Sequence, residues 1–344
     1  MRALPHLLTL ALLATPLAAC LEELPRPSTV DDLRILAVRH EPAEARPGDS
    51  VALEALVADP LERPASYAWA TCLVPEQGFG FFSGSSETSS SGGNGYGLDG
   101  AGSCFDLAAA GAPHARLLGV APTATLDVPA DLFDDGAVLR TAYGLPETVD
   151  LPAELEAAFL GVAGVNLTVS LRVSVDGRMV EATKRVNVGL PSVLPDNAAN
   201  ENPGAPAIHF TRKVDGQTPP TDAPPPALGT CTLADTTPPA LERGTRYVLA
   251  PVNLPDPPPT YAILLGGSTT DAPFELVYDQ ENAYFSWFAT AGDLARDVTK
   301  SSSDPSNTWL VPVDAPDALD LWIVVRDGRG GTAWCTSRFA VKDP

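Results

Sequence analysis

The chain has 344 residues, enough for two domains of ordinary size, and its 44% apolar content is sufficient to build packed cores. The 35 prolines and 28 glycines, set against only 19% charged residues, favour turns and extended segments over long helices. The formal net charge of −21 excludes nucleic acid as a partner, because such a chain repels phosphate groups.

The first 19 residues are typical of an export signal. Arg2 is their lone positive charge, residues 7–13 are apolar, and Leu17-Ala18-Ala19 ends the segment at a cleavage site. An apolar stretch of this length is too short to cross a bilayer, since a spanning helix needs about 20 residues. We therefore expect a signal peptide over residues 1–19 and a mature chain that does not cross a membrane.

The motif Leu17-Ala18-Ala19-Cys20 resembles the lipobox of bacterial lipoproteins. The resemblance implies that the Cys20 sulfur receives a diacylglycerol group, that the chain is cut just before Cys20, and that the new amine is acylated, with palmitate as an expected label. Two or three acyl chains would hold the protein stably on membrane lipid. Leu21 stands where an Asp tends to cause inner-membrane retention, which implies the outer membrane, on its periplasmic or cell-surface face. The alternative is an ordinary secretory signal with an unmodified cysteine.

Residues 20–30 would then form the lipidated N-terminus and a stiff tether, because Pro25 and Pro27 keep the chain extended. Four further cysteines suit an oxidising compartment and allow three disulfide connectivities. Proximity in the sequence and the expected domain division favour Cys72–Cys104 and Cys231–Cys335. A zinc site is the alternative, which no CxxC pair or clustered histidine supports.

The first half reads as short β-strands. The runs "LRILAVRHEP", "SVALEALVAD" and "SYAWATC" come first, and residues 165–175 then alternate strictly between apolar and polar. Asp176-Gly177 turns the chain into the return strand "MVEATKRVNV", which predicts a hairpin. Lys184 interrupts the apolar set of that strand, so we expect a bulge or register change there. A short helix is expected at residues 152–160, and little else looks helical.

The second half repeats this plan. The runs "TRYVLAPVN", "TYAILLGG" and "AYFSWFAT" read as early strands. In residues 319–325 an aliphatic residue recurs at every second position, which is typical of a strand. The turn "DGRGG" then leads the chain into the strand "TAWCTSRFAV". Each half therefore has early strands, a tryptophan strand and a closing hairpin. We expect Trp69 and Trp287 to lie in the cores.

Both halves resemble immunoglobulin-like domains, including the polycystic-kidney-disease type, whose last hairpin often carries a similar Asp-Gly-Arg-Gly-Gly turn. The resemblance implies an all-β fold of two β-sandwiches in tandem, at residues 31–190 and 207–344, with a linker at 191–206. The linker carries oxygen ligands at Asp196, Asn197, Asn200, Glu201 and Asn202. A solvated linker is favoured over a calcium site, because the regular spacing of a calcium loop is missing.

A Ser/Gly-rich loop at residues 83–103 follows a cluster of aromatic residues in the first half. The aromatic side chains at the ends of this excursion are a candidate adhesive or sugar-stacking surface: Phe79, Phe81, Phe82 and Tyr96. The alternative is that they pack against the sandwich. A disulfide closing about thirty residues would stabilise the fold by roughly 3–4 kcal/mol.

Motifs for catalysis are missing from the sequence. The mature histidines (His40, His114 and His209) are scattered, and neighbouring acids such as Asp134-Asp135 are more often solvated than catalytic. We predict a non-catalytic, lipid-anchored cell-envelope protein without cofactor or metal, using its sandwiches as spacer and interaction surface toward envelope proteins or polysaccharide. The alternatives are a carbohydrate-binding or adhesion module and, less favoured, a hydrolase with a discontinuous carboxylate site.

Overall fold

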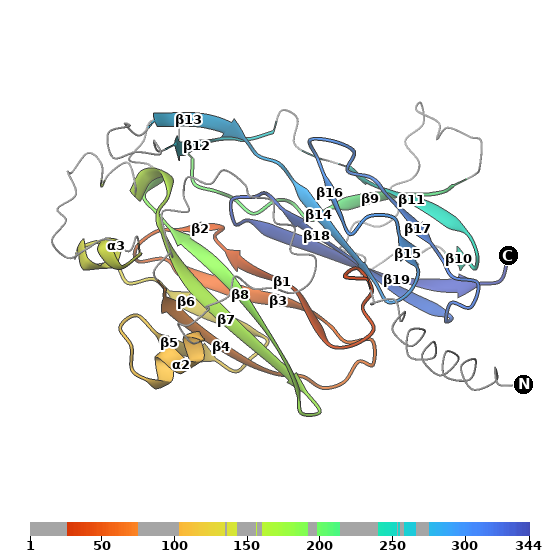
Figure 1. Ribbon diagram of the computed structural model, residues 1–344, viewed down its shortest axis with the longest axis horizontal. Helices are drawn as coiled ribbons and strands as arrows, with labels where there is room; N and C mark the ends of the chain where they lie inside the picture. Colours follow the sequence, from red (N-terminus) through yellow and green to blue (C-terminus); the bar gives the residue numbers. More distant parts are fainter. Residues whose placement is uncertain are drawn as a thin grey trace, which may run out of the picture.

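The computed structural model describes residues 26–74, 103–134, 136–142, 156, 160–191, 198–213, 240–252, 254, 258–265 and 275–344. Within these ranges the chain forms two β-sandwiches that lie side by side, with two short helices on the first (Figure 1). The prediction of an all-β fold with two sandwiches in tandem is confirmed.

The first sandwich packs a three-stranded sheet against a five-stranded one. The first sheet has the order β1 (Arg34–Glu41), β3 (Ser50–Ala58), β6 (Thr123–Asp127). The second has the order β2 (Glu44–Ala45), β8 (Arg178–Val188), β7 (Val165–Val175), β4 (Ser66–Leu73), β5 (Arg116–Gly119). The predicted alternation of β7 puts its apolar side chains into the core between the sheets, around the fully buried Trp69.

The expected irregularity at Lys184 is wrong. Strands β7 and β8 pair without a register shift from Val165↔Val188 to Val175↔Arg178, and Lys184 lies opposite Val169. The turn residues Asp176 and Gly177 both have positive φ, at 48° and 82°, which suits the tight turn predicted for this hairpin. Lys184 therefore keeps the core-facing parity of its strand, and its charged end must find a partner at the edge of the core.

The second sandwich packs a five-stranded sheet against a four-stranded one. The five-stranded sheet has the order β10 (Leu241–Glu242), β19 (Thr332–Lys342), β18 (Ala318–Arg326), β14 (Tyr284–Ala289), β16 (Val298–Lys300). The four-stranded sheet has the order β15 (Asp293–Leu294), β17 (Asn307–Leu310), β11 (Arg246–Val252), β9 (Ala207–Arg212). Trp287 is fully buried in the core between them, as predicted, beside Trp309 and Phe285.

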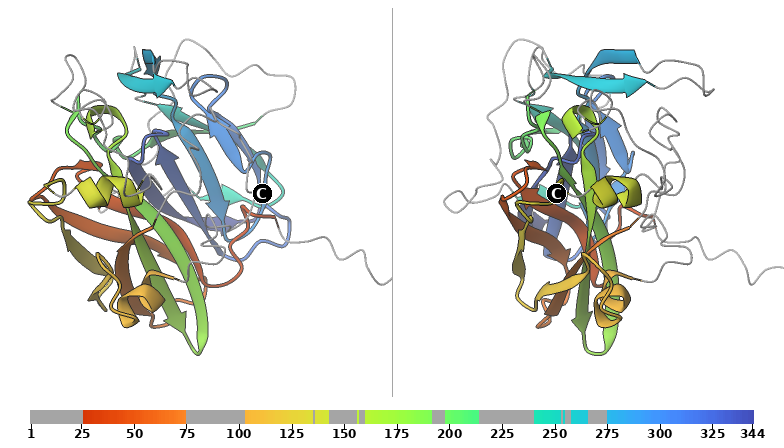
Figure 2. Two further views of the ribbon diagram at one scale, coloured as in Figure 1. Left: turned by 60° about the vertical axis from the view of Figure 1, so that its left-hand side comes forward. Right: turned by 90° about the vertical axis from the view of Figure 1, so that its left-hand side faces the viewer.

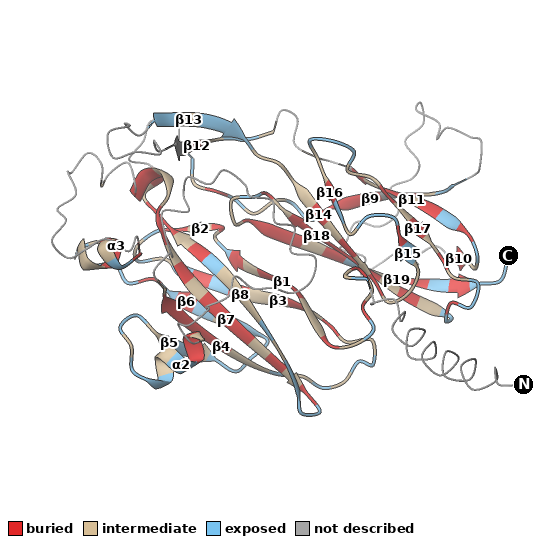
Figure 3. Ribbon diagram, in the orientation of Figure 1, coloured by how far each residue is buried: buried red, intermediate tan, exposed pale blue. Residues whose placement is uncertain are grey.

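Three local expectations need correction. The run "TYAILLGG" forms β12 (Thr260–Leu265), but it pairs with β13 (Glu275–Gln280) in a separate two-stranded sheet and not within the second sandwich. This hairpin stands out from the two sandwiches in two further views (Figure 2) and is largely exposed along β13 (Figure 3). Two helices were not predicted, α2 (Cys104–Ala109) and α3 (Gly136–Ala142). Of the helix expected at 152–160, only residues 156 and 160 are described, and both are helical.

The third correction concerns the expected tether. Residues 26–30 do not stand free, because they run along the second sandwich before the chain enters β1. Thr29 forms a parallel β-bridge with Ala289 at the end of β14. Ser28 and Val30 are 3% and 1% exposed. The expectation of a tether over residues 20–30 is therefore wrong for its second half.

Candidate functional site

The two sandwiches share an apolar interface, in which the outer face of β1 and β3 meets the outer face of β18. Its buried side chains form the interdomain cluster: Val30, Leu36, Ala37, Leu56, Ala58, Trp322 and Val324. The half-buried Phe288 and Trp334 pack against this cluster. Two cations of β1 cover their rings, Arg34 at 5.5 Å from the Phe288 centroid and Arg39 at 5.0 Å from that of Trp334.

Strand β18 explains why the sandwiches associate. Its inward positions, such as Leu321 and Ile323, fill the core of the second sandwich, while Trp322 and Val324 point to the opposite face and are 7% and 0% exposed. A strand with apolar residues on both faces must be covered on both sides. The first sandwich supplies that cover, so the domains form one body.

The linker takes part in this interface: Asn200 is buried, contrary to the expectation of a solvated linker, whereas residues 198, 201, 204 and 205 are exposed as expected. Asn200 is 5% exposed, and its side-chain amide donates to Oδ2 of Asp327 at 2.8 Å. The backbone N–H of Asn200 donates to Glu44 at 2.8 Å. Glu201, between Asn200 and Asn202, is exposed, and Asp196 and Asn197 lie outside the described residues.

Asn202 bridges the two sandwiches directly. Its amide nitrogen donates to the His40 carbonyl oxygen and to the Glu41 carboxylate, both at 2.7 Å, and its amide oxygen accepts from the Thr332 backbone N–H at 2.8 Å. Asn202 therefore serves as a structural bridge between the sandwiches.

The polar contacts across the domain boundary, here called the polar joint, include the half-buried ammonium group of Lys184. Lys184 Nζ reaches across the domain boundary and donates to the carbonyl oxygen of Gly330 at 2.6 Å and to the hydroxyl oxygen of Thr332 at 3.0 Å. Burial, together with the nearby charge of Arg326, lowers the pKa of Lys184 to about 8. Lys184 thus holds the predicted Asp-Gly-Arg-Gly-Gly turn of the second sandwich against the first.

His40 lies beside this lysine as a buried, neutral side chain. It is 1% exposed, and its Nδ1 lies 2.8 Å from the Pro42 carbonyl oxygen, where a protonated Nδ1 donates. Burial and the Lys184 charge lower the pKa of His40 to about 4. His40 is therefore a structural group of the interface.

Arg329, in the same turn, forms ion pairs with carboxylates of both sandwiches. Its guanidinium lies 3.0 Å from Oε1 of Glu281 and 3.6 Å from Oε2 of Glu44, and 4.8 Å above the ring of Tyr261. Burial raises the pKa of both carboxyl groups. A side chain at Gly331 would bring its Cβ within 2.1 Å of the Asp327 carboxylate, so only glycine fits there.

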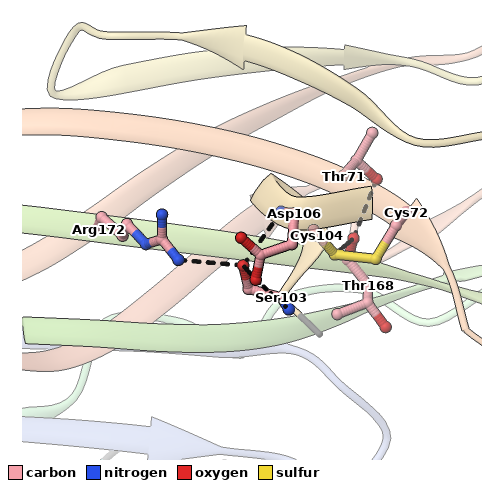
Figure 4. The surroundings of a disulfide bond; sticks show 7 residues. All are labelled: Thr71, Cys72, Ser103, Cys104, Asp106, Thr168 and Arg172. Atoms are coloured by element: carbon pink, nitrogen blue, oxygen red, sulfur yellow. Dashed lines mark hydrogen bonds between the residues drawn. A yellow bond between two sulfur atoms is a disulfide. The ribbon is translucent and has the colours of Figure 1, made fainter. Parts of the chain in front are cut away.

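The predicted disulfide Cys72–Cys104 is confirmed, with 5.2 Å between the Cα atoms (Figure 4). It joins the end of β4 to the start of α2. Ser103 caps this helix in a capping box with Asp106. Arg172 donates to the Ser103 hydroxyl at 3.0 Å and lies 4.1 Å above the ring of Phe105. Both ends of the Ser/Gly-rich excursion are thus fixed to one sheet.

The other candidate residues of the sequence fall mostly outside the described ranges. Cys20, Cys231 and the loop aromatics (Phe79, Phe81, Phe82 and Tyr96) lie there, as do Asp135 and the side chain of His209. Cys335 takes part in a disulfide, and its pairing with Cys231 stays a prediction.

Two surface cavities of about 550 and 540 Å³ occur in the described part of the chain. The first is largely apolar and lies between α2 and α3, with His114 at its wall. The second is lined by the carboxylates of Asp279, Glu281 and Asp327. Each of these acids accepts a hydrogen bond: Glu281 from Arg329, Asp327 from Asn200, and Asp279 from the Gln280 backbone. These acids therefore hold the local structure.

Among the described residues, His, Cys, Asp and Glu side chains do not come together in a group of three that could hold a metal ion. The helices of the same ranges are too short or too polar to span a membrane.

Comparisons with known proteins add little to this geometry. No protein-family model matches the chain, and no curated protein matches it significantly. Among solved structures, E. coli alpha-2-macroglobulin matches at 10% identity and a TM-score of 0.22, over 92% of this chain and 22% of that one. Drosophila N-cadherin EC1-4 matches at 11% identity and a TM-score of 0.19, over 89% and 50%. The Yersinia pseudotuberculosis adhesin InvE matches at 12% and 0.16, over 88% and 58%. The chain thus spans between about a fifth and three fifths of these proteins, and such low scores carry no argument about function.

Proposed function

We propose that this chain is a non-catalytic, lipid-anchored protein of the bacterial cell envelope, whose two sandwiches act as one rigid spacer and interaction surface. The observation that supports a rigid spacer best is the interdomain cluster with its polar joint. Trp322 and Val324 are buried by the other sandwich, and Lys184 and Asn202 bond across the boundary. Two sandwiches joined only by a flexible linker would leave these side chains exposed to water.

The anchor rests on the sequence. The lipobox-like Leu17-Ala18-Ala19-Cys20 follows an apolar segment too short to span a bilayer. The confirmed Cys72–Cys104 disulfide suits an oxidising compartment outside the cytoplasm. Leu21 after the cysteine favours the outer membrane, and the partners are envelope proteins or polysaccharide.

A non-catalytic role is supported by what the charged groups do. The titratable side chains of the interface, the buried His40 and the half-buried Lys184 and Glu44, are engaged in contacts that join the two sandwiches or lie beside them. Perturbed pKa values arise in structural networks as well as in active sites. Here the three groups with shifted pKa values all lie at the boundary between the two sandwiches.

Metabolic labelling tests the proposal. Cells producing the full chain are grown with radiolabelled palmitate, and the wild type is compared with Cys20→Ala. A double variant, Cys72→Ala with Cys104→Ala, is the matched control because it removes two cysteines elsewhere. We expect label in the wild type and in the control, and its loss in Cys20→Ala. Equal labelling of the wild type and Cys20→Ala would refute the anchor.

Pull-down of the lipidated protein from membranes then tests the interaction surface. We expect another envelope protein or a polysaccharide to be retained with it. Recovery of the wild type free of lipid in the culture medium would contradict the envelope assignment.

A further inference from the structure

The short segment between the lipidation motif and the first sandwich is docked on the second sandwich. Val30 N–H donates to the Ala289 carbonyl oxygen, and Ala289 N–H donates to that of Ser28, both at 2.9 Å. Arg26 donates to the Leu294 carbonyl oxygen at 3.0 Å and forms an ion pair with Asp293. The chain is thus fixed to β14 and β15 from residue 26 onward.

Only five residues separate Cys20 from Arg26. Fully extended, this stretch reaches about 20 Å between the two Cα atoms, at roughly 3.3–3.6 Å per residue. An acyl-bearing Cys20 would therefore hold the β15 edge of the second sandwich close to the lipid surface. The first sandwich is restrained through the same segment, because Asp32 pairs with its Arg63 and Arg178 and the two sandwiches form one body.

The two ends of the molecule differ in how far they lie from this attachment point. Asp293 and Leu294 of β15 pair with Leu310 and Trp309, so the exposed Val313 lies close along the chain. Strand β5 is the far edge strand of its sheet, at the opposite end from β2 and β8, which face the joint. In Figure 1, β5 and α2 lie toward one end of the long axis, whereas β15 lies toward the end that carries the C-terminus.

Two of the carboxylates near the attachment point are neutralised by ion pairs. Asp293 pairs with Arg26, and Asp304 pairs with Arg296 at 2.8 Å. Paired charges repel an anionic headgroup layer less than unpaired carboxylates do.

We propose that the docked residues 26–30 fix the orientation of the protein on the membrane. The β15 edge of the second sandwich lies beside the lipid headgroups, and the end of the first sandwich with α2 and the Cys72–Cys104 disulfide points away. This inference rests on the lipidation of Cys20 proposed above. It places the base of the Ser/Gly-rich excursion on the side that meets partners.

Energy transfer to the membrane tests the orientation. The lipidated full chain is inserted into phosphatidylcholine vesicles that carry a headgroup-linked acceptor. A fluorescent non-natural amino acid replaces either Val313 or Leu117, which are 78% and 69% exposed, so neither label disturbs a core. We expect clearly higher transfer efficiency from position 313 than from position 117.

A tether variant supplies the matched control. Twenty Gly/Ser residues inserted between Leu24 and Pro25 behave as a flexible coil and should make the two efficiencies converge. The same twenty residues added after Pro344 should leave the difference unchanged. The role of the short tether would be contradicted if the two transfer efficiencies converged in both insertion variants, or if they stayed different in both.

Mass spectrometry of the N-terminal peptide separates the two ways of failing. An unmodified Cys20 would overturn the proposed function and this inference together. Acylated Cys20 with equal or reversed efficiencies at positions 313 and 117 would overturn the orientation alone and leave the anchor intact.

Discussion

Lys184 of the first sandwich donates a hydrogen bond to the Gly330 carbonyl oxygen of the second, with 2.6 Å between Nζ and the oxygen. The group is largely buried, and burial together with Arg326 lowers its pKa from 10.5 to about 8. The contact therefore fastens the two domains, whereas burial and the charge of Arg326 disfavour the charged form of the lysine.

This displacement predicts a gain of stability at alkaline pH. Between pH 8 and 10.5 the unfolded chain binds more protons at Lys184 than the folded chain does, so the free energy of unfolding rises with pH through that window. The contribution is up to about 3 kcal/mol, at 1.36 kcal/mol per pKa unit. Urea unfolding at several pH values checks it, and Lys184→Met should remove this part of the slope. An identical slope in both proteins would argue against a buried charged lysine.

His40 predicts a loss of stability in acid. Its folded pKa of about 4 lies below the ordinary 6.5, so the unfolded chain binds more protons as the pH falls from 6.5 to 4. The free energy of unfolding should decrease by about 3 kcal/mol over that range. Acid titration of stability in the wild type and in His40→Gln measures the difference, because other groups titrate equally in both. A wild type no more acid-sensitive than His40→Gln would count against a buried neutral His40.

Trp322 tests the apolar part of the interface. Truncation to alanine leaves a cavity between the sandwiches, and we expect Trp322→Ala to cost about 3–5 kcal/mol, as for buried aromatic residues in general. It should also split the calorimetric unfolding of the two sandwiches into separate transitions. Leu321→Ala, on the opposite face of β18, should destabilise the second sandwich without loosening the interface. A Trp322→Ala variant as stable as the wild type would contradict the packing.

Asn200 tests the polar part. Its amide donates to the Asp327 carboxylate in a buried position, so Asn200→Ala leaves that carboxylate short of a partner. We expect a loss of about 1–3 kcal/mol in the free energy of unfolding. The neighbouring exposed Glu201 gives the control, because Glu201→Gln should change stability by no more than about 0.5 kcal/mol. Equal effects of the two changes would mean that the linker is solvated after all.

The sequence predicts the strands that have one buried face. Strand β7 alternates strictly, and the tryptophans of β4 and β14 mark the cores, so the two sandwiches and their closing hairpins could be predicted. Helix α2 was missed although Ser103 and Asp106 carry the spacing of a capping box, because the Ser/Gly-rich tract before it suggests a long excursion without structure.

The interface could not be predicted in the same way. Trp322 and Val324 alternate with the core residues of β18, so their apolar side chains indicate that both faces of this strand are buried. Lys184 lies among apolar residues on the core-facing side of β8, which indicates that its charge has a partner elsewhere in the chain. Neither signal says which surface provides the partner, because that depends on how the two sandwiches pack in space. The docking of residues 26–30 could not be predicted for the same reason, since the bridge joins Thr29 to Ala289, which lie far apart in the sequence.

The central claim is that the two sandwiches form one rigid body, and the distance between them tests it most directly. Spin labels carried by non-natural amino acids at Leu117 and Val313 report one exposed site on each sandwich. Double electron–electron resonance on the full chain should give a single narrow distance distribution, which broadens in Trp322→Ala. A broad distribution in the wild type would show that the sandwiches move independently and would contradict the claim.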